Sequence, residues 1–172
     1  MPRRSRKSVG GNYFHVMTQG IGKEYVFPDD NSKGFYISCL QKNKAVYPVK
    51  IIAFCVMGNH AHVLLSVSDH AELSKYLRRV NSDYARYYNR VHKRVGYVFR
   101  DRFRSELITD VKYLCHCAVY IQNNPIKAGI AEKAEDYKYS SFNNYLCGRG
   151  VVDFDESAKF FDVTAENMRA IP

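Results

Sequence analysis

The chain has 172 residues, a length that suits one domain with a sizeable hydrophobic core. Its 46% hydrophobic content excludes a wholly disordered chain, and no apolar run reaches the roughly 20 residues that a membrane-spanning helix needs. Of the net charge of +9, the first 150 residues carry +12. This excess favours a polyanionic partner, with nucleic acid ahead of a membrane surface, although a purely solubilising charge is the alternative.

The two ends of the chain carry opposite charges. Residues 1–11 form a basic tail that lacks the apolar stretch of a signal peptide. Residues 151–172 carry a net charge of −3, and we expect them to pack a short helix, over 156–161, on a domain that spans 12–150. Five cysteines without a Cys-x-x-Cys pair are typical of reduced thiols, so we expect a cytoplasmic protein with no membrane contact.

Hydrophobic periodicity and turn residues predict the main elements. Alternation of apolar and polar residues indicates strands, and spacings of three and four indicate helices. In chain order, the predicted elements are a strand over 12–19, a helix after Pro28–Asn31, strands over 46–56 and 60–67, a helix from Asp69 to His92, a strand over 97–105, a helix from Asp110 to Ile121, and an aromatic segment over 137–146 that packs on the core.

This order of strands and helices predicts an α+β fold of the ferredoxin-like (RRM-like) kind. Such a fold has an antiparallel sheet with its helices packed on one face. The other face of the sheet would then remain open for a ligand.

A His-x-His triplet lies at the start of the predicted strand over 60–67. Side chains alternate along a strand, so His60 and His62 should share one face, roughly 6.5 Å apart, while Ala61 and Val63 point into the core. Two imidazoles at this spacing can hold one divalent metal ion, or they can be two ordinary histidines beside a sheet. His15, His70 and His92 are interpreted as structural or surface residues. His116, one helical turn before Tyr120, is a possible but less favoured general base.

Several known metal-enzyme patterns do not fit the triplet. A histidine-triad hydrolase needs a third alternating histidine where this chain has Leu64. A two-histidine phosphoesterase needs two separate His-x-Ser/Thr motifs, and this chain has none. A di-zinc hydrolase needs an Asp-His pair directly after the triplet, where this chain has Val63-Leu64. A barrel amidohydrolase needs about 250 residues, more than this chain has. What remains is one metal held by two histidines and a third ligand from elsewhere in the chain.

An arginine-rich segment occupies residues 97–105. If it is a strand, Arg100, Arg102 and Arg104 lie on one face and repel one another unless anions lie opposite them. The planar guanidinium group matches phosphate oxygens, so a track for a nucleic-acid backbone is one interpretation. The alternative is an exposed strand face paired with local carboxylates such as Glu106.

Two motifs together resemble a known family. Met57-Gly58-Asn59-His60-Ala61-His62-Val63-Leu64-Leu65, followed by Tyr120-Ile121-Gln122-Asn123-Asn124-Pro125-Ile126-Lys127-Ala128-Gly129, is similar to the IS200-like and REP-associated single-tyrosine transposases of the HUH endonuclease superfamily. Each motif alone is a weak signal, but their combination is specific. The likeness extends over most of the chain.

The resemblance implies an enzyme that binds single-stranded or hairpin DNA and cuts it by transesterification. The nucleophile of the family matches Tyr120, its metal-binding histidines match His60 and His62, and its third ligand matches Asn124. Mg²⁺ or Mn²⁺ would be the cofactor, and histidine ligands favour the latter. For such a substrate, the DNA-binding residues that we expect are the arginines of the basic tail and of the 97–105 segment, Arg3, Arg4, Arg100, Arg102 and Arg104.

The spacing of the second motif is compatible with these roles. Residues four apart on a helix share a face, so Tyr120 and Asn124 can reach one site. However, Pro125 disfavours a helical conformation at Asn124. A free tyrosine has a pKa of about 10, so its hydroxyl needs help to lose its proton.

Three further questions stay open at the level of the sequence. The chain could be a replication initiator or relaxase of the same superfamily, although relaxases place their tyrosine before the histidines. It could also be a non-catalytic or domesticated DNA-binding relative. Finally, a homodimer could set Tyr120 of one chain against the histidines of the other.

Overall fold

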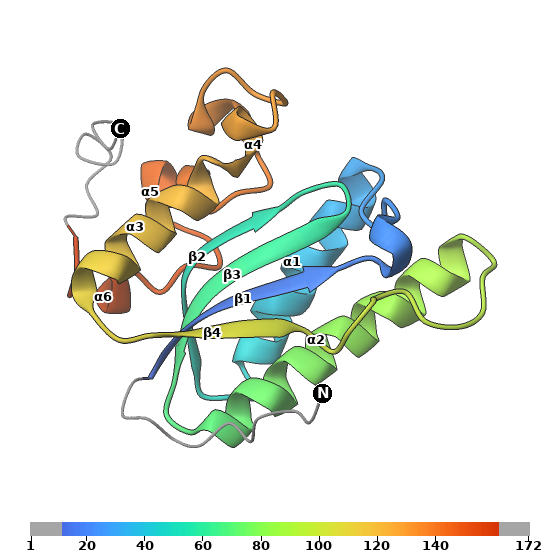
Figure 1. Ribbon diagram of the computed structural model, residues 1–172, viewed down its shortest axis with the longest axis horizontal. Coiled ribbons are helices and arrows are strands. Elements are labelled where there is room, and N and C mark those ends of the chain that lie inside the picture. The colour runs from blue at the N-terminus through green and yellow to red at the C-terminus, as the bar shows by residue number, and fades with distance from the viewer. Residues whose placement is uncertain (1–11, 162–172) are drawn as a thin grey trace.

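The computed structural model describes residues 12–161, and the tail over 1–11, with Arg3 and Arg4, lies outside the described residues, as do residues 162–172. The elements are β1 (Tyr13–Gln19), η1 (Ile21–Lys23), α1 (Asp30–Lys44), β2 (Val49–Val56), β3 (His60–Val67), α2 (His70–Val91), β4 (Arg104–Ile108), α3 (Val111–Gln122), α4 (Asn124–Lys127), η2 (Ala134–Asp136), α5 (Phe142–Cys147) and α6 (Phe154–Ser157). The sheet has the order β2-β3-β1-β4 and every neighbouring pair is antiparallel (Figure 1). The predicted α+β, ferredoxin-like fold is confirmed.

An aspartate precedes each of the three long helices and caps its first turn. The side chains of Asp29, Asp69 and Asp110 accept hydrogen bonds from backbone N–H groups of α1, α2 and α3, at 2.7 to 2.8 Å. Each bond satisfies one of the donors that a helix start leaves free. The sequence therefore sets where these helices begin.

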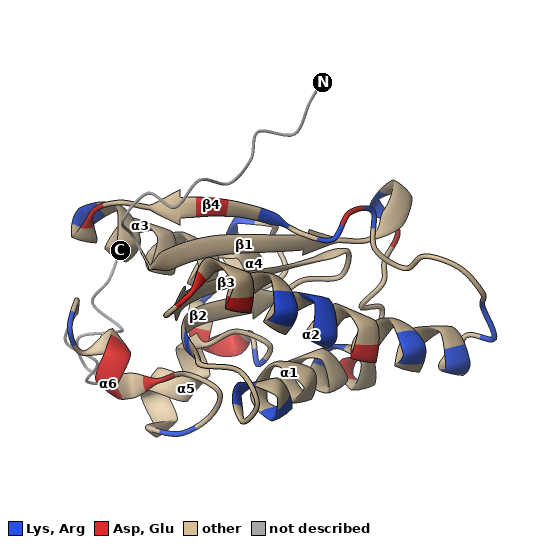
Figure 2. Ribbon diagram, turned by 90° about the horizontal axis from the view of Figure 1, so that it is seen from below, with Lys and Arg blue, Asp and Glu red and all other residues tan. Residues whose placement is uncertain are grey.

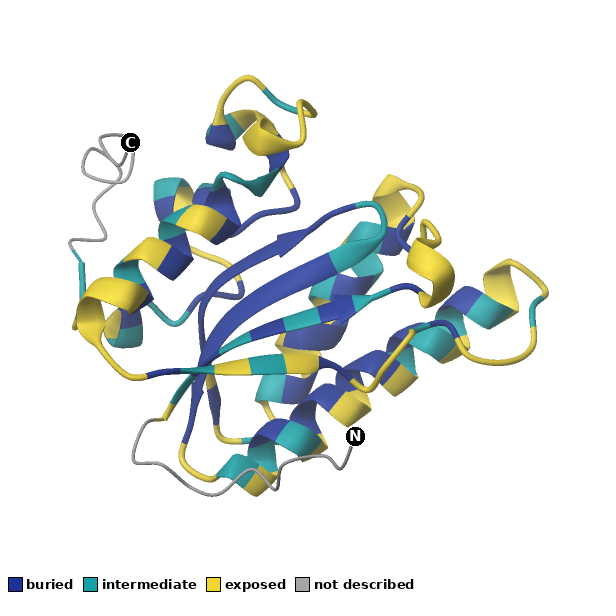
Figure 3. Cartoon of the chain, in the orientation of Figure 1, coloured by how far each residue is buried: buried dark blue, intermediate teal, exposed yellow. Residues whose placement is uncertain are grey.

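The helices α1 and α2 cover one face of the sheet, and the main core lies between them and the strands (Figures 1 and 2). On β1 the buried residues Phe14, Val16 and Thr18 alternate with partly exposed ones, as expected for a strand with two different faces. Thr18 also accepts a hydrogen bond from the Asn81 side chain of α2. In contrast, β2 and β3 are buried along almost their whole length (Figure 3).

The expectation that all helices pack on one face is correct for α1 and α2 but not for α3. This third helix lies against the opposite face of β2 and β3. There the ring of Tyr120 lies 5.8 Å from the ring of His62, between centroids. The sheet face expected to be fully open is thus divided. Its β2–β3 half is covered by α3, and its β1–β4 half, which we call the open half, carries exposed residues on β4.

The strand predicted over 97–105 is wrong in its position. β4 begins at Arg104 and runs to Ile108, while the preceding residues are irregular apart from a single bridge between Phe99 and Gly20. The reason is packing, because Val98 and Phe103 are both buried. Two positions of opposite parity cannot both face the core in one regular strand.

The chain after α3 closes the free edge of β2. Backbone bonds join Tyr139 and Ser141 to this edge, and the Asp153 carboxylate accepts the N–H of Ile51 at 2.7 Å. The expected packing of the 137–146 segment on the core is confirmed, whereas the terminal helix lies earlier than predicted, as α6. No helix within residues 12–161 has both the length and the apolar character to cross a membrane.

Candidate functional site

His60 and His62 lie on the sheet face opposite α1 and α2, as the alternation of the strand predicts. In the β1–β3 register His60 is opposite Gln19 and His62 is opposite Met17. Their ring centroids are 4.9 Å apart, with the ring planes nearly perpendicular. The neighbouring Ala61 and Val63 are buried on the helical side. Backbone geometry alone thus brings the two imidazoles together.

His62 is the most enclosed of these side chains, with 5% of its surface exposed. Its Nδ1 lies 2.9 Å from Nε2 of His15, and the two rings stack with centroids 5.0 Å apart. Burial, together with the charges that His15 and His60 would carry, lowers the pKa of His62 to about 3. His62 is therefore neutral near pH 7, which is the state that can bind a metal ion.

His60 makes a different contact in the turn between β2 and β3. Its Nδ1 lies 2.6 Å from Oδ1 of Asn59, and the Nδ2 of Asn59 donates to the Lys23 carbonyl at 3.4 Å. Burial lowers the pKa of His60 from its ordinary value. Both histidines of the triplet thus have Nδ1 occupied by a protein partner.

Tyr120 projects from α3 toward the same place. Its ring centroid lies 5.8 Å from that of His62 and 6.3 Å from that of His15, in edge-on contacts. The side chain is still 41% exposed, so a ligand can reach it. These four residues, His15, His60, His62 and Tyr120, are called the histidine–tyrosine cluster below. All of them come from one chain, so the histidines and the tyrosine meet without a second subunit.

The segment after α3 brings a cation to Tyr120. α4 begins directly at Asn124, and it places Nζ of Lys127 4.6 Å from the centroid of the Tyr120 ring. The reservation about Pro125 is resolved by a short helical turn in which Pro125 occupies an initial position, where its missing N–H is tolerated.

The side chain of Asn124 is held against its own helix. Its Nδ2 donates to the carbonyl oxygens of Tyr120 and Ile121, at 3.0 and 3.5 Å. The amide oxygen is the atom that could bind a metal ion. Both recorded bonds are local, so the ligand role of Asn124 stays a prediction.

The donor set fits a cation site that is open on one side. Within residues 12–161, no three side chains of His, Cys, Asp or Glu are gathered in a way that could hold a metal ion. A cation here would be bound by two imidazoles of β3, with oxygen atoms of an amide, water or a ligand filling the remaining positions. Such incomplete protein coordination is typical of catalytic rather than structural metal sites.

The three arginines of the 97–105 segment do not form one row. Arg100 and Arg104 line a small hollow with Met17 and Gln19, the β1 residues that stand opposite His62 and His60. Arg102 is exposed but does not line this hollow, and its carbonyl accepts from the Asn81 side chain. Two of the three guanidinium groups therefore border the cluster from the open half of the sheet.

Two residues of this region were missed from the sequence. His15 was interpreted as structural or surface, yet it stacks on His62, and Lys127 was quoted only as part of a motif. The ferredoxin-like strand order, which sets β1 beside β3, could have revealed His15. His116, considered as a base, is exposed on α3.

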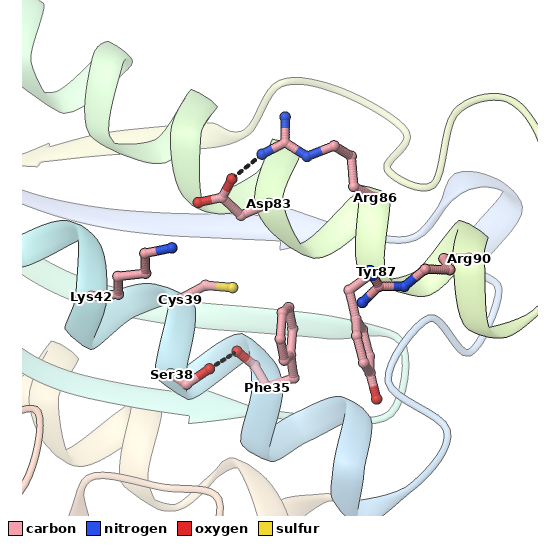
Figure 4. A pocket seen from close by; sticks show the side chains of 8 residues that line it. All are labelled: Phe35, Ser38, Cys39, Lys42, Asp83, Arg86, Tyr87 and Arg90. Atoms are coloured by element: carbon pink, nitrogen blue, oxygen red, sulfur yellow. Dashed lines mark hydrogen bonds and ion pairs between the residues drawn. The ribbon is translucent and has the colours of Figure 1, made fainter.

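A larger hollow, of about 330 Å³, lies on the far side of the molecule between α1 and α2. It is lined by the stacked rings of Phe35 and Tyr87 and by the charged side chains of Lys42, Asp83, Arg86 and Arg90 (Figure 4). Figure 4 shows Arg86 turned toward Asp83, with which it forms an ion pair. Because α1 and α2 cover the face opposite the histidines, this hollow is separate from the histidine–tyrosine cluster.

Comparison with known proteins gives three agreeing results. The family model described as "Transposase IS200 like" matches residues 8–124. A protein of Haemophilus influenzae that bears the name REP-associated tyrosine transposase is 27% identical over 157 residues, covering 82% of this chain and 84% of its own length. The solved structure of a REP-associated tyrosine transposase bound to a REP hairpin has a TM-score of 0.68 at 18% identity, and the match covers 95% of this chain and 90% of that one.

Proposed function

The chain belongs to the IS200-like transposase family, and we propose that it is a metal-dependent transposase that cuts and rejoins single-stranded DNA through a covalent tyrosine intermediate. One observation carries the proposal most directly. The exposed hydroxyl-bearing ring of Tyr120 lies beside His62, at 5.8 Å, although the two residues come from different motifs of the chain. Metal-assisted phosphoryl transfer through a covalent intermediate needs a nucleophile beside a bound cation, and Tyr120 next to the two histidines of the triplet could provide both.

The proposed reaction is a transesterification at a DNA phosphate. The hydroxyl oxygen of Tyr120 attacks phosphorus, a new O–P bond forms, and the bond to the 3′ oxygen breaks. The proton of the phenol passes to water, and the leaving 3′ oxygen takes one up from water. The products are a 5′-phosphotyrosine and a free 3′-OH, and attack by a 3′-OH reverses the step without an external energy source.

His60, His62 and Asn124 would hold a divalent cation in this scheme. Bound Mg²⁺ or Mn²⁺ supplies Lewis-acid polarisation of the scissile phosphate. The low pKa of His62 supports such a role, because a neutral imidazole can donate a lone pair whereas an imidazolium cannot.

Cationic side chains of the protein would place the DNA. Arg100 and Arg104 line the hollow next to the cluster, and their guanidinium groups would bind DNA phosphates, with a phosphate replacing Asp101 as the partner of Arg100. Lys127 lies against the ring of Tyr120 and would offset negative charge where the phosphate and the phenol meet. The substrate we propose is single-stranded DNA that carries a hairpin, and the hairpin complex of the matched transposase structure is consistent with it.

The cluster is assembled within one chain, so we propose that cleavage occurs in cis. The homodimer considered from the sequence would then serve to hold two DNA ends together rather than to complete the site. The runner-up functions, a replication initiator or relaxase and a non-catalytic DNA-binding protein, become outcomes of the experiments below.

The test is cleavage of labelled single strands, with hairpins taken from the flanks of the gene, by wild type and Tyr120→Phe. We expect the variant to lose nicking entirely while its DNA affinity stays within about twofold, because only the attacking oxygen is removed. Tyr87→Phe, which removes a hydroxyl on the far face, is the matched control and should nick normally. Nicking by Tyr120→Phe at the wild-type rate would refute the nucleophile, and binding without nicking by wild type would favour the non-catalytic alternative.

A further inference from the structure

The two histidines of the triplet share a feature that their family role does not require. Each has its Nδ1 atom engaged by another side chain, His60 by Asn59 and His62 by His15. The two partners come from different elements, the β2–β3 turn and β1. In both rings Nε2 is left as the nitrogen that faces away from the protein partner.

For His60 the partner fixes which nitrogen carries the proton. The amide of Asn59 is oriented by its Nδ2, which donates to the Lys23 carbonyl, so its oxygen faces the imidazole. An amide oxygen only accepts hydrogen bonds, so Nδ1 of His60 must carry the proton. The neutral ring then presents a lone pair at Nε2.

For His62 the partner is a second imidazole, and two proton arrangements are conceivable. If Nδ1 of His62 donates to Nε2 of His15, then Nε2 of His62 is free to bind a cation. If His15 donates instead, the proton of neutral His62 sits on Nε2 and blocks that atom. The surroundings of His15 therefore decide whether His62 can act as a ligand.

A carboxylate near His15 favours the first arrangement. Glu106 stands directly opposite His15 in the β1–β4 register. Burial lowers the pKa of His15, so that its ring is neutral near pH 7, and the negative charge of Glu106 acts in the opposite direction. Nε2 of His15 is the nitrogen that contacts His62, so a proton on Nδ1, the other ring nitrogen, leaves Nε2 as an acceptor. Glu106 itself accepts a hydrogen bond from the Tyr113 hydroxyl of α3, at 2.7 Å, so the helix of Tyr120 also holds the carboxylate.

The packing of His15 gives it a second effect on the same site. Its ring stacks on His62 and touches the edge of the Tyr120 ring, at centroid distances of 5.0 and 6.3 Å. His15 thus supports His62 from the side of β1 and keeps it in line with the helix that carries the nucleophile.

From these contacts we propose that His15 and Asn59 are positioning residues, which hold His62 and His60 as Nδ1–H tautomers with both Nε2 lone pairs directed at one shared divalent cation. This inference rests on the proposed function, because it assumes that the histidine pair binds the cation. Partners of this kind usually matter for affinity, and their loss typically costs about 10- to 100-fold in metal binding.

The first test needs neither metal nor a variant. Nitrogen–proton correlation spectra of the wild-type protein, with ¹⁵N in its histidine rings, report the tautomer of each neutral histidine at pH 7.5. We expect protons on Nδ1 of His60, of His62 and of His15. A proton on Nε2 of His62 would overturn the proposal.

The second test measures Mn²⁺ binding by electron paramagnetic resonance of the free ion. We expect His15→Leu and Asn59→Ala to bind Mn²⁺ about 10- to 100-fold more weakly than wild type. His15→Gln and Asn59→Asp, which keep an acceptor oxygen, should recover most of the affinity, a rescue that a purely structural role would not produce. Folded His15→Leu with wild-type affinity, or equal losses in the Leu and Gln variants, would contradict the proposal.

The outcomes also separate this inference from the proposed function. If wild type forms the covalent DNA adduct but its His62 is the Nε2–H tautomer, the function stands and the inference fails. If wild type binds no Mn²⁺ but still forms the adduct at Tyr120, the inference and the metal dependence of the proposed function both fail, while the tyrosine nucleophile stands.

Discussion

The two halves of the sheet face opposite α1 and α2 are built for different tasks. On the β2–β3 half, α3 covers the strands, His62 is almost fully enclosed, and the rings of His62 and Tyr120 lie in edge-on contact. On the open half, the residues of β4 alternate between exposed and partly buried positions up to the buried Ile108 (Figure 3). Arg100 and Arg104 line the small hollow next to the histidines, and Arg100 also forms an ion pair with Asp101. The difference suggests that chemistry is confined to the covered half and that DNA is held mainly by the open one.

The largest effect should follow a substitution in the covered half. His62→Ala removes an imidazole from the proposed cation site, and the loss of several kcal/mol of charge stabilisation corresponds to a nicking rate about 10³-fold lower. Single-turnover nicking with saturating DNA measures this directly. His116→Ala, an exposed histidine on α3, is the control and should stay within a few-fold of wild type. A reduction below tenfold for His62→Ala would mean that the covered half is not the catalytic centre.

A smaller effect on the nicking rate is expected for Lys127, which would lie beside the DNA phosphate in the proposed reaction. Lys127→Gln removes the cation that lies over the Tyr120 ring, and a loss near 1.4 kcal/mol lowers the rate about tenfold. DNA affinity should change much less than the rate, and Lys127→Arg should keep most of the activity. If affinity falls while the rate is unchanged, Lys127 belongs to the DNA-holding surface instead.

Substitutions in the open half should weaken binding without a comparable effect on the chemical step. We expect Arg104→Ala and Arg100→Ala each to reduce the salt dependence of single-strand binding by about 0.7 in the log–log slope, as the loss of one phosphate contact predicts. Fluorescence anisotropy across a salt series is the measurement. Arg78→Ala on α2 changes the net charge equally on the far face and should leave the slope alone. Equal slopes for the three variants would show that the open half has no special part in binding.

The smallest effect is expected from mixing two inactive chains. Tyr120→Phe and His62→Ala each lack one part of the site, and because the site is assembled in cis, their mixture should remain inactive after subunits have been allowed to exchange. Recovery of a substantial fraction of wild-type nicking would show that the tyrosine and the histidines of different chains can combine, which contradicts the single-chain arrangement.

Alternation along strands accounts for what the sequence predicted well. The shared face of His60 and His62, with Ala61 and Val63 on the other side, depends only on backbone geometry and on the apolar run that forms β3. The helix starts were equally predictable, because Asp29, Asp69 and Asp110 act within their own turns. Such interactions join residues that are close in the sequence, so they can be predicted without the rest of the fold.

The features that were missed depend on contacts between distant segments. Val98 and Phe103 both turn inward because the core needs them, so β4 starts only at Arg104 and the expected row of three arginines is broken. His15 joins the cluster only because β1 pairs with β3, and α3 covers half of the sheet face because of its packing on β2. None of these contacts leaves a periodic signal in the sequence.

Locating the covalent bond between protein and DNA identifies the nucleophile of the proposed reaction. Wild-type protein is incubated with Mn²⁺ and a 5′-labelled and 3′-labelled pair of hairpin-bearing single strands, then denatured, digested and analysed by mass spectrometry. The proposed mechanism predicts one adduct, a 5′-phosphotyrosine on the peptide that contains Tyr120, with a free 3′-OH on the released strand. Cleavage without an adduct, or an adduct on any other residue, would contradict it.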